Sequence, residues 1–180
     1  MWTLPNIITL ARVGFLPWIL LLIWPGVESR TTSLWAAVLY AVAGTLDLVD
    51  GYVARRRNEV TVFGKFLDPL ADKIFYLVTL TAMLQLPRDI PMWIVLVALT
   101  REIAITGLRT MAISEGIVIA ADSGGKLKTT FATVGMCALL IYYPYAVDYG
   151  FGVTVFNPHR IGLWITYLSV AFSLYSGAHY

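Results

Sequence analysis

The chain has 180 residues, of which 58% are hydrophobic and 13% are charged, and its formal net charge at pH 7 is +2. Ordinary soluble domains carry about 25% charged residues. Together with a mean hydropathy of +0.73, this composition argues against a soluble globular domain. A net charge so close to zero also gives no reason to expect a nucleic-acid partner.

Apolar residues are gathered into six runs, each of a length that can cross a bilayer, roughly 17 to 25 residues. The runs cover residues 7–25, 34–54, 69–86, 91–113, 127–146 and 161–178. Proline, glycine or charged residues separate them. We therefore expect an all-α integral membrane protein with six transmembrane helices. Residues 1–180 should form a single membrane domain with a polar cavity that faces the cytoplasm.

Basic residues are unevenly shared between the two sides that alternating linkers would occupy. One side has eight Lys and Arg residues and the other has three. The eight are Arg55, Arg56, Arg57, Lys65, Lys73, Arg109, Lys126 and Lys128, and the three are Arg30, Arg88 and Arg160. Because cytoplasmic linkers carry the excess of Lys and Arg, we expect the linkers after the second and fourth runs, and both chain ends, to face the cytoplasm at the cell membrane.

The first predicted helix carries three polar residues on one face. Asn6, Thr9 and Arg12 are spaced by three, so they lie along the same side of a helix. Asn6 follows Pro5 and could instead cap the helix at the membrane surface. Arg12 could either pair with a carboxylate elsewhere in the chain or extend its charged end to the membrane surface.

Four aspartates surround the junction of the second and third runs. Asp47 and Asp50 are three residues apart, and Asp68 and Asp72 are four apart, so each pair lies on one face of a helix. We expect two helices joined by a short basic turn, with the acidic faces opposed near the cytoplasmic surface. Asp68 and Pro69 also have the pattern of a helix start, with Asp68 as the cap.

Carboxylates gathered in this way repel one another unless a cation neutralises them. Oxygen ligands favour Mg²⁺, Mn²⁺ or Ca²⁺. Small residues beside the aspartates, Gly51 and Ala54, would let a bulky ligand approach the backbone, and Arg55 can bind phosphate with its planar fork. The alternative is a belt of salt bridges between the aspartates and nearby basic residues. That alternative explains the basic residues but neither the regular spacing nor the glycines.

Charged residues also occur in and after the fourth run. Arg101 and Glu102 lie within apolar sequence, where charges usually have a functional or pairing role. Arg109, Lys126 and Lys128 would gather on the cytoplasmic side, close enough to bind one anionic group. Alternatively, Arg101 and Glu102 form a structural pair, and the two lysines are anchors at the membrane surface.

The aspartate segment follows a pattern that is specific to one family. Residues 47–72 read D-x-x-D-G-x-x-A-R, then eight residues, then G-x-x-x-D-x-x-x-D. In every fixed position and both spacings this resembles the CDP-alcohol phosphotransferase family. The resemblance implies an integral membrane enzyme with six helices, usually a homodimer. Such enzymes transfer a substituted phosphate from a CDP-linked donor to an alcohol and release CMP.

The resemblance also implies roles for individual residues. Asp47, Asp50 and Asp68 would bind Mg²⁺ or Mn²⁺, and Asp72 would lie at the same metal and act as the general base. The residues expected to bind the CDP portion are Gly51, Ala54, Arg55 and Gly64 of the motif, together with Asn6 and Thr9 of the first helix.

Three further segments are similar to the branch of the family whose acceptor is sn-glycerol 3-phosphate. They read P-N-x-x-T-x-x-R at residues 5–12, R-E followed by L-R at 101–109, and G-K-x-K-T-T at 125–130. This similarity implies CDP-diacylglycerol, a membrane lipid, as the donor and phosphatidylglycerophosphate as the product. The acceptor's phosphate would be bound by Arg101, Arg109, Lys126 and Lys128.

Two other functions fit part of the sequence. A protein of the same fold could use another acceptor, such as inositol phosphate or phosphatidylglycerol. A divalent-cation channel or transporter could be lined by the four aspartates, but it would need neither the motif glycines nor Arg55, both of which suit a pyrophosphate site. We therefore favour the phosphatidyl transfer.

Overall fold

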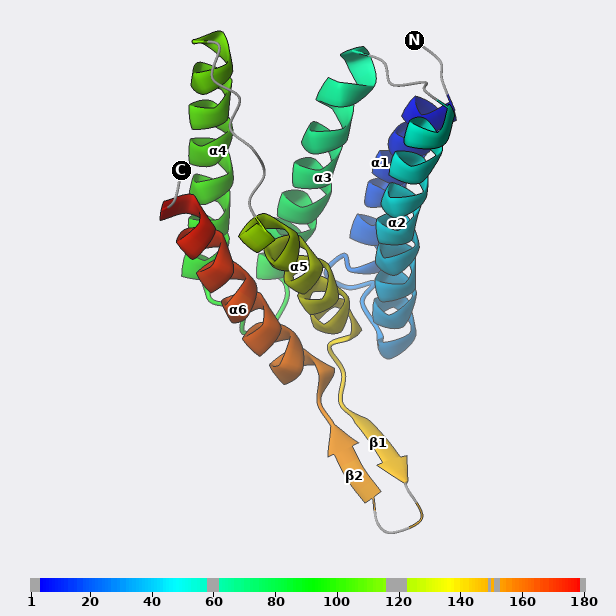
Figure 1. Ribbon diagram of the computed structural model, residues 1–180. Coiled ribbons are helices and arrows are strands. Elements are labelled where there is room, and N and C mark those ends of the chain that lie inside the picture. The colour runs from blue at the N-terminus through cyan, green and yellow to red at the C-terminus, as the bar shows by residue number, and fades with distance from the viewer. Residues whose placement is uncertain (1–3, 58–61, 116–122, 149, 151–152, 179–180) are drawn as a thin grey trace.

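The computed structural model describes residues 4–57, 62–115, 123–148, 150 and 153–178 (Figure 1). Six α-helices, one short 3-10 helix and a two-stranded hairpin are present in these residues. In chain order they are α1 (Leu4–Leu22), α2 (Arg30–Arg57), α3 (Val62–Ala82), η1 (Met83–Gln85), α4 (Met92–Ser114), α5 (Ser123–Ile141), β1 (Tyr145–Asp148), β2 (Val153–Phe156) and α6 (Pro158–Ala178). The expectation of an all-α fold with six helices is therefore confirmed, with the hairpin as an addition.

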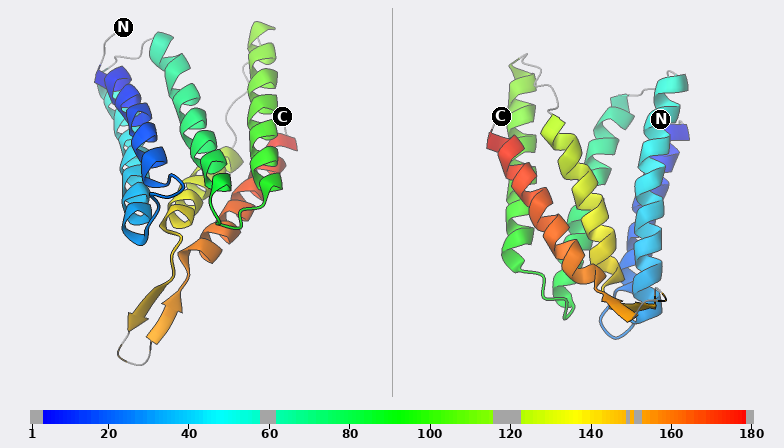
Figure 2. Two further views of the ribbon diagram at one scale, coloured as in Figure 1. Left: turned by 180° about the vertical axis from the view of Figure 1, so that it is seen from behind. Right: turned by 60° about the horizontal axis from the view of Figure 1, so that its bottom comes forward.

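The bundle has two distinct ends. The end of α2 and the start of α3 lie together at one of them, which we call the motif end (Figures 1 and 2). The turns after α1 and α3 lie at the other, which we call the hairpin end because the hairpin projects from it. The first turn of α1 and the last turn of α6 both lie away from the hairpin, and successive helices run in alternating directions between the two ends, as the sequence predicts.

The helices pack around a core that α1, α2, α3 and α5 share. Helix α1 packs against both α2 and α3, α2 also packs against α5, and α6 packs against α5 and α4. For example, Leu16 and Ile19 on α1 and Ile23 just after its end are buried at positions three and four apart, so one stripe faces the core. Helix α1 therefore contacts both helices that carry the acidic motif.

Helices α5 and α6 approach closely where two glycines meet. A Cβ atom added to Gly162 would lie 2.7 Å from the backbone nitrogen of Leu139 and 3.0 Å from the carbonyl oxygen of Gly135. These neighbours are backbone atoms, which cannot move aside as a flexible side chain can. The contact therefore requires a residue without a side chain at position 162.

Helix α5 ends before the predicted end of the fifth run. It stops at Ile141, and Tyr142 has a φ of 57°, in the left-handed region that side chains disfavour. Pro144 then follows, and strand β1 pairs antiparallel with β2, with Tyr145 opposite Phe156. The prediction of a span reaching residue 146 was wrong because these aromatic and β-branched residues form a strand.

Helix α3 begins earlier than predicted. It starts at Val62, so Asp68 and Pro69 lie inside the helix rather than at its first turn. The prediction that Asp68 caps the helix was therefore wrong. Pro69 has no N–H to donate to the carbonyl of Lys65, but the rest of the helical hydrogen-bond pattern can continue around this one missing bond.

Many large apolar side chains lie on the outside of the bundle. The most exposed include Trp164 at 69%, Trp18 at 64% and Trp35 at 61%. Even so, no helix within the described residues is both long enough and apolar enough to cross a membrane. The six membrane spans remain a prediction.

Candidate functional site

The acidic motif lies on two consecutive helices, α2 and α3, toward the motif end of each. Asp47 and Asp50 are in the C-terminal half of α2, and Asp68 and Asp72 are in the first half of α3. Because both segments are helical, each pair of aspartates lies on one helix face, as the spacing predicts. The two predicted helices are confirmed, and the turn predicted between them, residues 58–61, lies outside the described residues.

Most side chains of the predicted site lie outside the described part of the structure, although their backbone is helical. These are Asp47, Asp50, Gly51, Ala54, Arg55, Gly64, Asp68, Arg109, Lys126 and Lys128. No group of three or more His, Cys, Asp or Glu side chains gathers among those that are described. Since Asp72 alone of the four aspartates belongs to the described side chains, the predicted metal ligands remain a prediction.

Asp72 is joined to Arg12 across the α1–α3 contact. The Nη1 atom of Arg12 donates a hydrogen bond of 2.8 Å to Oδ1 of Asp72. The two side chains differ greatly in exposure, 3% for Arg12 and 49% for Asp72. The sequence left two possibilities for Arg12, and the structure confirms pairing with a motif carboxylate rather than extension to the membrane surface.

The three polar residues of α1 share a buried face. Asn6, Thr9 and Arg12 are all buried, as their spacing of three along one helix predicts. Helix α1 begins at Leu4, so Asn6 lies within the first turn and is not the cap residue. A polar face thus points from α1 into the protein at the level of Asp72, and a role for Asn6 and Thr9 in binding CDP stays a prediction.

The residue after Asp72 connects α3 to α4. Lys73 donates a hydrogen bond through Nζ to the hydroxyl oxygen of Thr106. Thr106 in turn donates to the backbone carbonyl of Glu102, one turn earlier in α4, at 2.6 Å. Polar contacts therefore link three helices at this level, with Arg12 on α1, Asp72 and Lys73 on α3, and Thr106 on α4.

Arg101 is bonded within the protein. Its Nε atom donates to the backbone carbonyl of Ser173 in α6 at 3.0 Å, and its Nη1 atom donates to Oε1 of Glu102 at 3.3 Å. Both side chains are nearly buried. Such contacts are expected if Arg101 and Glu102 form a structural pair, which was the alternative to phosphate binding. No sequence pattern indicates the part played by α6, because a backbone carbonyl accepts this bond.

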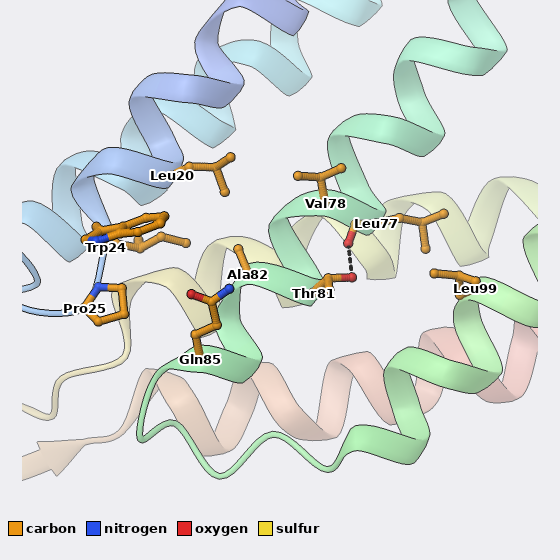
Figure 3. A pocket seen from close by; sticks show the side chains of 10 residues that line it. Leu20, Trp24, Pro25, Leu77, Val78, Thr81, Ala82, Gln85 and Leu99 are labelled. Atoms are coloured by element: carbon orange, nitrogen blue, oxygen red, sulfur yellow. Dashed lines mark hydrogen bonds between the residues drawn. The ribbon is translucent and has the colours of Figure 1, made fainter.

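A cavity of about 360 Å³ lies at the other end of α3, between α1, α3 and α4 (Figure 3). Its walls are mainly apolar and include Leu20, Trp24, Leu77 and Val78. The hydroxyl of Thr81 is bonded to the backbone carbonyl of Leu77 at 2.7 Å. This cavity is therefore not the polar cavity predicted at the motif, which remains a prediction.

Comparison with known proteins relates nearly the whole chain to one family. The family model described as CDP-alcohol phosphatidyltransferase matches residues 2–175. A protein of Bacillus subtilis (strain 168) is 38% identical, with the match covering 100% of this chain and 94% of the relative. A protein of Escherichia coli (strain K12) is 34% identical over 94% of this chain and 95% of its own length.

The names of these relatives agree. Both the Bacillus and the Escherichia proteins are CDP-diacylglycerol--glycerol-3-phosphate 3-phosphatidyltransferases. A third relative, from Mycobacterium tuberculosis (strain ATCC 25618 / H37Rv), is a "probable phosphatidylglycerophosphate synthase". It is 38% identical over 74% of this chain and 63% of its own length.

Proposed function

The chain belongs to the CDP-alcohol phosphatidyltransferase family, and we propose that it transfers the phosphatidyl group of CDP-diacylglycerol to sn-glycerol 3-phosphate. The products are phosphatidylglycerophosphate and CMP. One observation carries this proposal: two relatives named for that reaction match at least 94% of both chains compared. The same names favour glycerol 3-phosphate over inositol phosphate or phosphatidylglycerol as acceptor.

In the proposed reaction, one phosphorus–oxygen bond replaces another. The acceptor's hydroxyl oxygen bonds to the phosphorus that carries diacylglycerol, and the bond from that phosphorus to the bridging oxygen breaks. CMP leaves with the bonding electrons, and Asp72 takes the hydroxyl proton as general base. The exposure of the Asp72 side chain, about half of its surface, supports this assignment because an acceptor can reach the carboxylate.

We propose Mg²⁺ or Mn²⁺ as the cofactor, bound by Asp47, Asp50, Asp68 and Asp72. The donor set supports this choice, because carboxylate oxygens suit both ions, and the aspartates of each pair have the spacing of one helix face, on α2 and on α3. When bound, the ion would neutralise the charge of the pyrophosphate and of the departing CMP.

Around this centre we propose two binding regions. The residues for the CDP portion are Asn6, Thr9, Gly51, Ala54, Arg55 and Gly64, and those for the acceptor's phosphate are Arg101, Arg109, Lys126 and Lys128. The buried face formed by Asn6, Thr9 and Arg12 supports a polar environment beside Asp72. Arg101 is bonded to α6 and to Glu102, so the alternative to phosphate binding is that Arg101 stabilises the helix packing.

We also propose that the six helices lie in the cell membrane, with the motif end facing the cytoplasm, and that the protein is a homodimer. The excess of exposed apolar side chains on the helices supports the membrane location. The charge asymmetry of the linkers supports the orientation. This location would let a lipid donor enter from the bilayer while a soluble acceptor arrives from the cytoplasm.

The test of the function is CMP release by the detergent-purified protein. CDP-diacylglycerol is supplied with glycerol 3-phosphate, inositol phosphate, serine or phosphatidylglycerol in separate reactions, each with Mg²⁺ or with EDTA. We expect metal-dependent release with glycerol 3-phosphate alone. Release with another acceptor would contradict the phosphate-binding assignment, and metal flux into vesicles without any CMP release would favour a cation transporter.

A further inference from the structure

We propose that Arg12 is a positioning residue, which holds the carboxylate of Asp72 in the orientation that the reaction requires. The proposal rests on the proposed function, in which Asp72 takes the acceptor's proton. The sequence left the role of Arg12 open between pairing with a carboxylate and reaching the membrane surface. The assignment comes from the contact between α1 and α3.

The two side chains of the Arg12–Asp72 bond differ greatly in exposure. The side chain of Arg12 is 3% exposed and that of Asp72 is 49% exposed, and Nη1 of Arg12 lies 2.8 Å from Oδ1 of Asp72. A buried guanidinium is held in one place by its packing, whereas a half-exposed carboxylate has more room around it for other rotamers. A charge-assisted bond between them fixes the mobile partner to the immobile one.

Packing already fixes the backbone of α1 and of α3 on the two sides of the bond. On α1, Thr9 and Leu16 are buried on either side of Arg12. On α3, the ring of Phe75, one turn after Asp72, stacks on Tyr40 of α2 with ring centroids 4.8 Å apart. With the backbone of both helices held in this way, the bond to Arg12 restricts the torsions of the Asp72 side chain.

A positioning role and a purely structural role predict different effects of removing Arg12. The carboxylate of Asp72 is half exposed and within reach of water, so the loss of this ion pair should itself cost the fold little. Reaction rate, in contrast, depends steeply on the position of a catalytic group, and a misplacement of about 1 Å can lower turnover by a factor of about 10². A positioning role therefore predicts a large effect on turnover with a small effect on stability.

The experiment compares Arg12→Met and Arg12→Lys with the unchanged chain, all as full-length protein in detergent. For Arg12→Met we expect kcat to fall by a factor of about 10². KM for each substrate should stay within a factor of about three, since only the orientation of the base has changed. Arg12→Lys keeps the charge but lacks the planar fork, so it should recover part of the lost kcat. The Tm of both variants should stay close to that of the unchanged chain.

Arg88→Lys is the matched control. Arg88 is also a buried arginine paired with a carboxylate, that of Glu28, but it lies at the hairpin end. We expect this variant to lower Tm while kcat per folded molecule stays unchanged.

Three results would overturn the proposal. They are an unchanged kcat in Arg12→Met, a rise in KM at unchanged kcat, which would make Arg12 a substrate contact, and a loss of activity that matches a loss of folded protein. Failure of the unchanged chain to release CMP would instead contradict the proposed function, and the positioning role would fall with it.

Discussion

The two ends of the bundle each hold an arginine bonded to a carboxylate, but they use the pair differently. At the motif end the carboxylate of Asp72 is half exposed beside a buried Arg12. At the hairpin end Arg88 is completely buried, and its partner Glu28 is nearly so, with 10% of its side chain exposed. An accessible carboxylate can take part in a reaction, whereas an enclosed ion pair can only stabilise the packing of the elements around it.

Arg88 joins three separate parts of the chain. It donates to the carbonyls of Leu139 and Leu140 at the end of α5, at 2.7 and 3.1 Å, and to the hydroxyl of Ser33 on α2 at 2.9 Å. It also donates to Glu28 in the turn after α1. The last carbonyls of a helix need partners from outside it, so Arg88 completes α5. Burial lowers the pKa of Arg88, and the neighbouring Glu28 opposes that effect.

The pair at the motif end should therefore serve the reaction, and the pair at the hairpin end should serve stability. A substitution at Asp72 should affect turnover with little effect on folding, and a substitution at Arg88 should do the reverse. Substitutions at the two ends should therefore be distinguishable by measuring turnover and unfolding in the same variants.

Asp72→Asn should reduce the rate of CMP release by a factor of about 10² to 10⁴, the usual contribution of a general base. Asparagine keeps the shape of the side chain but cannot take the proton, so binding of CDP-diacylglycerol should be largely preserved. The matched control is Asp148→Asn, because Asp148 is an exposed aspartate at the hairpin end that accepts a bond from the Gly150 nitrogen. Near-normal turnover in Asp72→Asn would show that the base is another group.

Arg88→Leu should lower the free energy of unfolding by about 3 to 5 kcal/mol, because it leaves the carboxylate of Glu28 nearly buried without its charge partner. Chemical or thermal unfolding in detergent measures this loss. Arg30→Gln serves as the control, since Arg30 at the same end is exposed and donates to the carbonyl of Pro144. A loss in Arg88→Leu no larger than in the control would mean that the buried network contributes little to stability.

Gly162→Ala should lower the free energy of unfolding by about 1 to 3 kcal/mol, the usual cost of forcing an added methyl into a packed contact. The methyl would meet the backbone of α5 at 2.7 Å. Gly14→Ala is the matched helical control, because nothing lies within 4 Å of a Cβ added there. Alanine at position 14 should be neutral or stabilising, by up to about 1 kcal/mol. Equal Tm values for the two variants would contradict a tight α5–α6 contact.

His159 should make stability depend weakly on pH. Burial lowers the pKa of His159 below its ordinary value, and the nearby charge of Arg88 adds to this effect. The folded state therefore favours the neutral ring. As the pH falls below about 6.5, the unfolded chain takes up a proton that the folded chain resists, so stability decreases, by about 1.4 kcal/mol per unit of pKa difference.

Tm measured between pH 7.5 and 5 should therefore fall further for the unchanged chain than for His159→Gln. Equal pH dependence in the two proteins would assign the effect to other groups.

The sequence was sufficient for features that depend on local periodicity. The six helices follow from apolar runs, and the positions of the aspartates on α2 and α3 follow from spacings of three and four residues. The shared face of Asn6, Thr9 and Arg12 has the same origin. Each of these features needs knowledge of only one helix at a time.

Features that depend on contacts between distant segments were not accessible in this way. Arg88 reads as an ordinary linker residue, because its partners lie more than 50 positions away along the chain. The first residues of the hairpin, Tyr145 and Ala146, read as the end of a helix, because aromatic and apolar residues suit either structure. The bond from Arg12 to Asp72 was one of two possibilities, and packing of α1 against α3 selects it.

The most direct test of the proposed function follows the acceptor into the product. The purified protein is given CDP-diacylglycerol, Mg²⁺ and isotopically labelled sn-glycerol 3-phosphate, and both CMP and label in the lipid phase are measured. We predict equal amounts of CMP and labelled phosphatidylglycerophosphate, with neither formed in EDTA. CMP released without label in the lipid would mean that water is the acceptor, and would contradict phosphatidyl transfer to glycerol 3-phosphate.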